Sequence, residues 1–317
     1  MSARVHGLHH VTAIAGEPRV NLEFYVGALG LRLVKKSVNQ DAPDTYHLFY
    51  ADAVGTPGTD LTFFPWPTMA PARSGAGHAT EVLFGIPEGS LADWTSRLKE
   101  RGVRVGAVET RFGERTLPFR DPHGLPLALV ETDDDRAWSA WPRSPVPESL
   151  QLRGMHGVRL RVRDLGPTRA LLEEVFGFEG QGDEDGWNRF AAPGAGSGAL
   201  VEVRADPQQG LGRWGTGGVH HVAWHVRDDD EQMAIRARVE GMGLRPTPQI
   251  DRFWFRSVYF REPGGVLFEL ATEGPGFGRD EEMEHLGEKL ILPPWLESRR
   301  SEIESALPPL DAAAARP

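Results

Sequence analysis

The chain contains no cysteine among its 317 residues. This absence excludes disulfide bonds and also excludes zinc or iron–sulfur sites built on thiolates. Any metal ion bound by the chain must therefore be held by His, Asp or Glu side chains. A chain without cysteine is compatible with a reducing compartment, and we expect a cytoplasmic protein.

Long apolar runs and an excess of positive charge are absent as well. No run of apolar residues is long enough for a membrane helix, and residues 1–20 lack the apolar centre of a signal peptide. The formal net charge is −10, which argues against sequence-independent nucleic-acid binding because that needs a basic surface. We expect neither a nucleic acid nor a membrane as partner, whereas a homo-oligomer is permitted.

One order of elements, β-α-β-β-β, recurs four times along the sequence. In the first copy, strands are predicted at 8–14, 31–34, 46–50 and 60–64, with a helix at 20–29. The later copies open with strands at 80–86, at 157–162 and at Val219, and their helices are predicted at 90–101, 166–176 and 229–240. In every copy a glycine ends the helix just before a new strand, which is a common C-terminal stop.

These repeats predict an α+β protein of four tandem βαβββ modules that form two half-barrel-like domains. We assign modules 1 and 2 to an N-terminal domain, 1–132, and modules 3 and 4 to a C-terminal domain, 151–272. A polar, Pro-rich linker, 133–150, separates them. The tail, 273–317, is predicted to contain a helix after Pro293-Pro294, with Leu296, Ile303 and Leu307 as its buried stripe.

Two pairs of histidines lie at equivalent places in the first and fourth modules. Leu8-His9-His10-Val11-Thr12-Ala13 and Val219-His220-His221-Val222-Ala223-Trp224 are nearly the same string. Glu269 lies on the last strand of the fourth module, after a Pro263-Gly264-Gly265 turn. Two histidines and one carboxylate are the ligand set of non-haem Fe(II) oxygenases. This pattern therefore favours an oxygen-using metalloenzyme.

Four such modules, with His on a first strand and Glu on a last strand, resemble the vicinal oxygen chelate superfamily. That superfamily includes glyoxalase I, bleomycin-resistance proteins and extradiol ring-cleaving dioxygenases, and the resemblance extends over almost the whole chain. A more specific resemblance is to the hydroquinone-type ring-cleaving dioxygenases. It is carried by the strings Gly7–Thr12, Leu33–Asn39, Tyr46-His47-Leu48, Gly55–Thr59 and Leu292–Glu297. It implies the vicinal oxygen chelate fold and metal ligands from the first and fourth modules.

The module openings align on the residues that follow each histidine, and this alignment puts His10 and His221 at the ligand position. On a strand without a β-bulge only one histidine of each pair can point inward, so the alternative ligands are His9 in place of His10 and His220 in place of His221. With Glu269 as the carboxylate, we predict that His10, His221 and Glu269 bind Fe(II). Mn(II) accepts the same ligands.

The second and third modules lack a complete ligand set. In the third module the position that matches His221 is Gly157, because His156 stands one residue too early. The offset from Glu262 to Glu269 leads in the second module from Asp121 to Ala128, which cannot bind a metal. We therefore expect these two modules to form a scaffold half.

Other candidates for chemistry lie close to the ligands in sequence. Tyr259 faces Glu269 across the hairpin if 263–265 is a three-residue loop, and it would then donate a hydrogen bond or a proton. Arg252 would stabilise negative charge, or else form a surface ion pair with Asp251 or Glu262.

The histidine that precedes each ligand is a further candidate. His9 and His220 would act as acid/base groups, or would only orient their neighbours. The resemblance implies functional residues at the positions of His9, His220, Arg252 and Tyr259. It also implies Thr12 as part of the lining of the substrate pocket.

The function predicted from these residues is a Fe(II)-dependent extradiol-type ring-cleaving dioxygenase. It would insert both atoms of O2 into a hydroquinone or a catechol-like diphenol, so a small aromatic diphenol and O2 are the expected partners. One alternative is a glyoxalase-like metal-dependent isomerase or lyase, which usually needs a fourth protein ligand; no candidate stands beside Thr12 or Phe63. Another is a non-catalytic binder of a drug or quinone, which on this fold lacks the metal triad.

Overall fold

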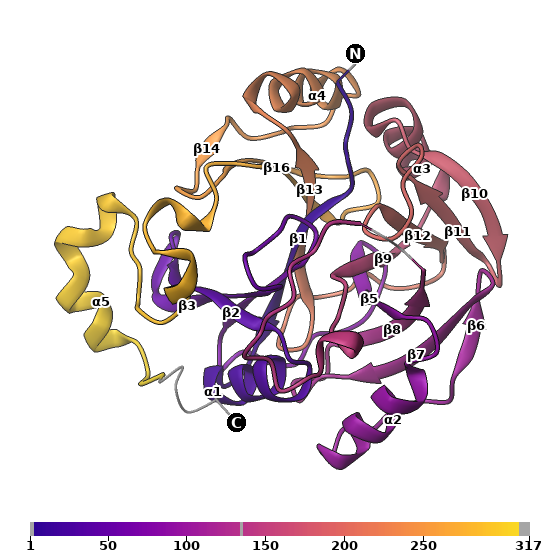
Figure 1. Ribbon diagram of the computed structural model, residues 1–317. Helices are drawn as coiled ribbons and strands as arrows, with labels where there is room; N and C mark the ends of the chain where they lie inside the picture. The colour runs from indigo at the N-terminus through magenta and orange to yellow at the C-terminus, as the bar shows by residue number, and fades with distance from the viewer. Residues whose placement is uncertain (1–2, 134–135, 311–317) are drawn as a thin grey trace.

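The computed structural model describes residues 3–133 and 136–310 and confirms four βαβββ modules (Figure 1). The first module consists of β1 (Leu8–Ala15), α1 (Pro18–Leu22), β2 (Arg32–Asn39), β3 (Ala42–Ala51) and β4 (Asp60–Pro65). The second consists of β5 (His78–Pro87), α2 (Leu91–Glu100), β6 (Glu109–Arg111), β7 (Glu114–Arg120) and β8 (Pro126–Thr132).

The second half of the chain repeats this order. The third module consists of β9 (Met155–Val162), α3 (Leu165–Ala170), β10 (Glu179–Glu184), β11 (Trp187–Ala191) and β12 (Leu200–Ala205). The fourth consists of β13 (Val219–Val226), α4 (Asp229–Gly241), β14 (Ile250–Asp251), β15 (Arg256–Arg261) and β16 (Leu267–Thr272). Short 3₁₀ turns at 148–150, 277–279 and 283–285 lie in the connecting segments.

Two of the predicted helices change their winding part-way. The helices expected at 20–29 and 166–176 begin as α1 and α3 and continue as π-helical segments, Glu23–Ala28 and Leu171–Phe176. Both end as predicted at a glycine. Gly177 has φ of 78° and Gly30 has φ of 74°, a left-handed conformation that glycine adopts without a Cβ penalty.

The strands form two eight-stranded sheets. The first sheet has the order β14-β15-β16-β13-β1-β4-β3-β2, and the second β10-β11-β12-β9-β5-β8-β7-β6. In each sheet the first strands of two modules pair antiparallel at the centre, β1 with β13 and β5 with β9. Modules 1 and 4 thus share one sheet and modules 2 and 3 share the other. The predicted segments 1–132 and 151–272 each contribute one module to each sheet, so the sheets do not follow those sequence boundaries.

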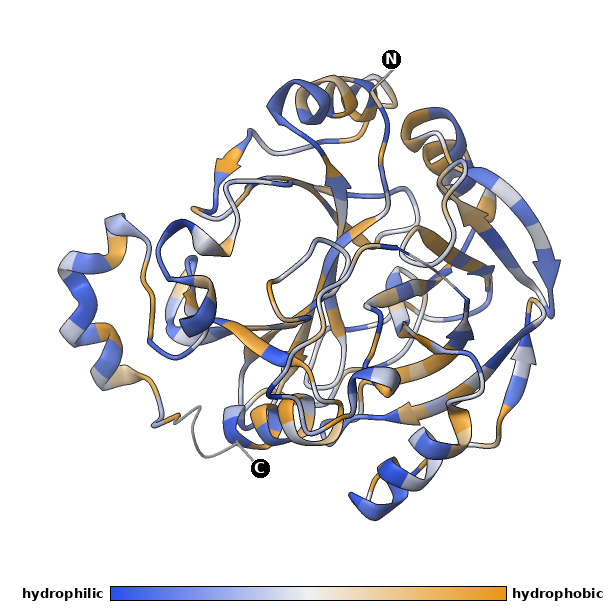
Figure 2. Cartoon of the chain, viewed as in Figure 1, coloured by the Kyte–Doolittle hydropathy of each residue, from blue (hydrophilic) through white to orange (hydrophobic). Residues whose placement is uncertain are grey.

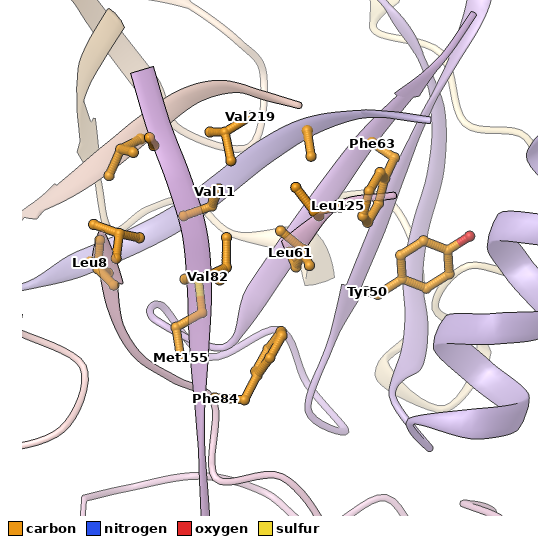
Figure 3. Packing of buried hydrophobic residues seen from close by; sticks show 14 of the residues in the cluster. Leu8, Val11, Tyr50, Leu61, Phe63, Val82, Phe84, Leu125, Met155 and Val219 are labelled. Carbon is orange, nitrogen blue, oxygen red and sulfur yellow. The ribbon is translucent and has the colours of Figure 1, made fainter. Parts of the chain in front are cut away.

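The main hydrophobic core lies where the central strands of the two sheets meet (Figure 3). Val11 of β1, Val82 of β5 and Met155 of β9 belong to one buried cluster and are fully shielded from solvent. Burial of an aliphatic side chain of this size contributes about 1.5–3 kcal/mol. This core holds the two sheets together and leaves the opposite face of each sheet for polar side chains.

Helices pack against strands of both sheets, α2 against β7, α3 against β12 and α4 against β13, β15 and β16. Figure 2 shows hydrophilic and hydrophobic residues alternating along α2 and α4. The predicted tail helix is present as a 3₁₀ segment, Pro294–Arg299, followed by α5 (Arg300–Ala306). Its predicted stripe of Leu296, Ile303 and Leu307 is buried. In the part of the chain that the structure describes, no helix has the length and apolar character to cross a bilayer. Parts of the predicted linker (134–135) and tail (311–317) lie outside the described residues.

Candidate active site

Three side chains from the central strands of the first sheet meet on its polar face. Nε2 of His221 lies 2.9 Å from Oε2 of Glu269, and Nε2 of His10 lies 3.3 Å from the same oxygen. The two Nε2 atoms are 3.3 Å apart, and all three residues are at most 4% exposed. Among the described residues, this is the one group of His, Asp and Glu side chains arranged to hold a metal ion.

The strand register explains why residues so distant in sequence meet here. Val11 on β1 pairs with Val222 on β13, so His10 and His221 occupy related positions just before this pair. Ala223, two residues after His221, pairs with Glu269 on the parallel strand β16. The carboxylate therefore arrives from the strand next to β13, on the same face as both histidines.

A β-bulge lies at the first histidine of each pair. Leu8 and His10 pair with the adjacent residues Trp224 and Ala223, so His9 is the extra residue on β1. His220 is the extra residue on β13 in the same way, between Val219 and His221. Bulges re-aim side chains and are frequent beside active sites. Here they break the alternation that would otherwise send neighbouring histidines to opposite faces of the sheet.

As a result, each histidine of a pair contacts its neighbour. Nδ1 of His9 is 2.9 Å from Nδ1 of His10, and Nδ1 of His220 is 2.8 Å from Nδ1 of His221. The ring of His9 also packs against Phe255, and the ring of His220 stacks on Trp214 with centroids 4.4 Å apart. His10 and His221 are therefore held from behind, with Nε2 of each directed toward Glu269.

Burial determines the protonation of these imidazoles. It lowers the pKa of His221, and it lowers the pKa of His220 to about 3, assisted by the adjacent charge of His221. Burial also holds the pKa of His9 well below its ordinary value. These rings are neutral near pH 7, and a histidine must be neutral to bind a metal.

Glu269 stays ionised although it is fully buried. Burial alone would raise its pKa, but electrostatic interactions and hydrogen bonds with His10 and His221 outweigh this effect and hold the pKa well below its ordinary value. The Ser257 hydroxyl donates a hydrogen bond of 2.5 Å to Oε1. Oε2 is left facing the two histidines, so the carboxylate is oriented for ligation.

A pocket opens in front of these residues. It holds about 390 Å³ of empty space, counting its open mouth, and it is lined by His10, Asn39, Gln40, Asp41, His47, Phe49, Phe64, His221, Arg252, Trp254, Phe255 and Tyr259. Phe, Trp and Tyr rings form part of its walls, and imidazole, amide, carboxylate and guanidinium groups form the rest. That composition is typical of a site for a small aromatic molecule.

Tyr259 and Arg252 both reach this pocket. Tyr259 pairs directly with Glu269 across the β15–β16 hairpin, which confirms the predicted register. The guanidinium of Arg252 lies 5.3 Å from the centre of the Tyr259 ring. Burial and the charge of Glu269 raise the pKa of Tyr259 despite this cation, so its hydroxyl is protonated.

The ion pair of Arg252 differs from both alternatives considered from the sequence. Its Nη2 lies 2.9 Å from Oδ2 of Asp41, at the turn between β2 and β3. Gln40 in the same turn donates a hydrogen bond of 2.9 Å to the Arg252 carbonyl oxygen. The partner is therefore neither Asp251 nor Glu262 but a residue some 200 positions away, which sequence spacing does not reveal.

Thr12 stands behind the pocket wall. It is fully buried, and its hydroxyl lies 2.7 Å from that of Thr62, which in turn lies 2.9 Å from Nε2 of His47. His47 lines the pocket, with its ring centroid 3.9 Å from that of Phe49. Sequence reasoning missed both His47 and Ser257. His47 stands in one of the strings that carry the family resemblance, and this was the available signal.

Comparison with known proteins agrees with the fold and the site. Residues 7–129 and 154–270 match the model of the Glyoxalase/Bleomycin resistance protein/Dioxygenase superfamily. The chain belongs to this superfamily. The two matched ranges contain all four modules and all three residues of the candidate metal site.

Several relatives align with nearly the whole chain. A Bacillus subtilis protein named as a ring-cleaving dioxygenase, MhqE, is 42% identical over 97% of this chain and 100% of its own length. A chlorohydroquinone/hydroquinone 1,2-dioxygenase of Sphingobium indicum is 35% identical over 95% of each chain. The crystal structure of a B. subtilis protein described as a dioxygenase superposes with a TM-score of 0.92 at 39% identity, over 98% of this chain and 99% of that one.

Glyoxalase I from Zea mays shares the fold at a greater distance. Its structure superposes with a TM-score of 0.61 at 15% identity, covering 84% of this chain and 92% of the maize chain. The modular architecture is therefore common to both proteins. This level of similarity shows the fold alone.

Proposed function

We propose that this protein is a Fe(II)-dependent, extradiol-type ring-cleaving dioxygenase that acts on hydroquinones. The observation that carries the proposal is the convergence of His10, His221 and Glu269 at the inner end of an aromatic pocket. Two imidazoles and one ionised carboxylate on one side leave the pocket side free for other ligands. This arrangement is typical of the non-haem Fe(II) oxygenases.

The donor set fits a divalent metal ion. Oε2 of Glu269 is buried without a hydrogen-bond partner of its own and faces Nε2 of both histidines, so a cation would satisfy all three atoms. When bound, Fe(II) would lower the pKa of a coordinated phenol and bring the diphenol and O2 together as a redox centre. Mn(II) accepts the same ligands and is the alternative metal.

Tyr259 and Arg252 are the proposed catalytic residues. Because the Tyr259 hydroxyl is protonated, it can donate a hydrogen bond to a substrate oxygen at the metal-binding face or hold a proton there. Arg252 places a permanent positive charge beside that hydroxyl, where it would stabilise negative charge on the substrate. His47 also lines the pocket, and burial holds the pKa of its ring well below the ordinary value. Its neutral imidazole is a further candidate for contact with the substrate.

His9 and His220 are better explained as positioning residues than as acid/base groups. Each contacts the Nδ1 atom of a ligand histidine and is packed under an aromatic ring behind the pocket. Partners of this kind fix the tautomer and the orientation of a ligating imidazole. Their role would be to keep Nε2 of His10 and His221 available for the metal.

Two observations favour a hydroquinone as substrate. Phe49, Phe64 and Trp254 line the pocket and suit a flat ring. The S. indicum relative is named for chlorohydroquinone and hydroquinone, and it aligns with 95% of the chain.

The fourth-ligand position of a glyoxalase-like isomerase would lie on the last strand of the first module. Thr62 there pairs with Thr12, as Glu269 pairs with Ala223. A threonine that hydrogen-bonds to Thr12 and His47 is no counterpart of the Glu or Gln ligand such an enzyme needs.

The decisive test is oxygen consumption by protein loaded anaerobically with Fe(II). Hydroquinone, methylhydroquinone, chlorinated hydroquinones and catechol are offered in turn, and ring opening is followed by absorbance. We expect uptake of one O2 per hydroquinone ring opened and a stoichiometric metal content. His221→Ala should abolish both metal binding and uptake.

His225→Ala is the matched control, because His225 lies on the same strand outside the metal group. It should retain metal and activity. Stoichiometric metal binding without oxygen uptake on any diphenol would refute the dioxygenase proposal and favour the isomerase. Absence of metal binding would favour a non-catalytic binder.

A further inference from the structure

A cleft on the second sheet gathers an unusual number of arginines. Its lining includes six, which we call the arginine cleft: Arg73, Arg111, Arg120, Arg159, Arg161 and Arg213. The lining contains a single carboxylate, that of Glu81. The chain as a whole carries a formal net charge of −10, so this local excess of positive charge runs against the overall balance.

Three of the six arginines are neutralised by acidic partners. Arg111 lies 2.7 Å from Glu81, Arg159 lies 2.6 Å from Glu202, and Arg161 lies 3.2 Å from Asp206. The other three are not. Within the described residues, no carboxylate comes within the 4.0 Å ion-pair distance of Arg73, Arg120 or Arg213.

Backbone pairing positions Arg73 and Arg213, and a local hydrogen bond positions Arg120. The backbone of Arg73 pairs with that of Arg213 through two hydrogen bonds of 3.0 and 2.9 Å, so two loops far apart in sequence present neighbouring side chains. The guanidinium of Arg120, at the end of β7, donates a hydrogen bond of 2.7 Å to the Gly124 carbonyl oxygen. All three side chains are exposed, and their other N–H groups remain available to a ligand.

The size and charge of the cleft limit what it can bind. It holds about 1130 Å³ of empty space, counting its open mouth, against about 390 Å³ for the pocket beside the histidines by the same measure. Clefts lined by one sign of charge concentrate counter-ions, and guanidinium groups bind carboxylate and phosphate oxygens in pairs. An extended nucleic acid would meet the acidic remainder of the surface, which favours a small ligand.

We propose that the arginine cleft is a binding site for a small divalent oxyanion, either a phosphate or a compact dicarboxylate. The three unpaired guanidinium groups of Arg73, Arg120 and Arg213 would hold its oxygens. Arg159 and Arg161, which lie against the face of Trp187, would contribute to the positive wall. The site lies on the second sheet and does not involve His10, His221 or Glu269.

Isothermal titration calorimetry of the full chain in HEPES at low ionic strength tests this proposal. The probes are inorganic phosphate and maleate, with acetate as a monovalent comparison. We expect one saturable site for at least one dianion, binding at least tenfold tighter than acetate and weakening as salt is added. Binding of phosphate alone would identify a phosphate site, and tighter binding of maleate would identify a dicarboxylate site.

Variants locate the binding. Arg120→Ala/Arg213→Ala should weaken dianion binding at least tenfold with an unchanged thermal unfolding midpoint, because both side chains are exposed. Arg245→Ala is the matched control: Arg245 is exposed, lies outside the cleft lining and should leave the affinity unchanged. The proposal is overturned if neither dianion shows saturable binding, or if the double variant binds as well as the parent chain.

Discussion

The two sheets have the same architecture but opposite chemistry on their polar faces. Val11 pairs with Val222 at the centre of the first, and Val82 with Val158 at the centre of the second. Each sheet has two bulges here: His9 and His220 are the extra residues in the first, and Thr80 and His156 in the second. The backbone that presents the candidate metal-binding triad is therefore present twice, and the side chains alone decide what each copy can bind.

The residues at equivalent positions make the difference clear. Where the first sheet has His10, His221 and Glu269, the second has Glu81, Gly157 and Glu202. A Cβ at position 157 would approach the Leu200 carbonyl oxygen to 2.8 Å. The second sheet thus has no room for one of the two histidines.

The two equivalent carboxylates also have opposite surroundings. Both oxygens of Glu202 accept hydrogen bonds of 2.6 Å, one from Arg159 and one from Arg189. Arg189 stands opposite Glu202 in the sheet, where Tyr259 stands opposite Glu269. In the second sheet the charge is neutralised inside the protein. In the first it is directed at two histidines, an arrangement suited to a cation.

Neutralising Glu269 and Glu202 in turn tests most directly whether the two sheets have different roles. Glu269→Gln should reduce oxygen uptake with hydroquinone to background, because the metal loses its only anionic ligand. Glu202→Gln should retain full uptake per bound metal ion. Metal analysis and an oxygen electrode measure both quantities. Equal losses of activity in the two variants would contradict the proposal that only the carboxylate of the first sheet binds the metal.

Stability should respond in the opposite sense. Glu202→Gln should lower the free energy of unfolding by about 1.5–3 kcal/mol, because Arg159 and Arg189 lose the carboxylate that bridges them and keep only Glu81, at 3.6 Å, and Glu114, at 2.7 Å. Urea unfolding followed by circular dichroism measures this change. In metal-free protein, Glu269→Gln should cost less, since its neighbours are imidazoles and not guanidinium groups. A larger loss for Glu269→Gln than for Glu202→Gln would contradict the contrast between the two carboxylates.

Tyr259 occupies the position in the first sheet that Arg189 occupies in the second, and removing its hydroxyl tests a catalytic role. Tyr259→Phe should lower kcat by about 10²-fold with little change in metal content, because the variant loses only a hydroxyl that donates to the substrate. Steady-state kinetics with hydroquinone measure the effect. An unchanged kcat would reassign Tyr259 to packing against His221.

The bulge histidines give a smaller and more specific effect. His220→Ala should weaken metal binding by about 10–100-fold, since the Nδ1 atom of His221 loses its partner. His156→Ala, at the matching bulge of the second sheet, should leave metal affinity unchanged. Competition with a fluorescent chelator measures both dissociation constants. If His220→Ala lowers kcat without changing metal affinity, His220 is an acid/base group and not a positioning residue.

Much of this arrangement was predictable from local patterns. The repeated strings around His10 and His221 mark equivalent strands, and the Pro263-Gly264-Gly265 turn sets the distance from Tyr259 to Glu269. Periodicity and glycine stops predicted all four modules, because these signals arise from residues close together in the chain. Leu296, Ile303 and Leu307 were predicted as a buried stripe for the same reason.

Features that depend on contacts between distant segments were not predictable in this way. The bulges at His9 and His220 arise from the pairing of β1 with β13, and the ion pair of Arg252 depends on a turn in another module. His47 reaches the pocket only because β3 and β4 extend the sheet beside β1. Glu202 escaped notice because its equivalence to Glu269 lies in the strand register and not in a shared motif.

Residue patterns along the chain were enough to predict the four modules, the absence of thiolate chemistry and the three residues that meet at the candidate metal site. Strand pairing was needed to show that modules 1 and 4 share one sheet. It was also needed to show that His9 and His220 contact candidate metal ligands, and that arginines neutralise the carboxylate of the second sheet. The physical reason is that local periodicity is set by neighbouring residues. The partner of a charged side chain is set by strand pairing across hundreds of residues.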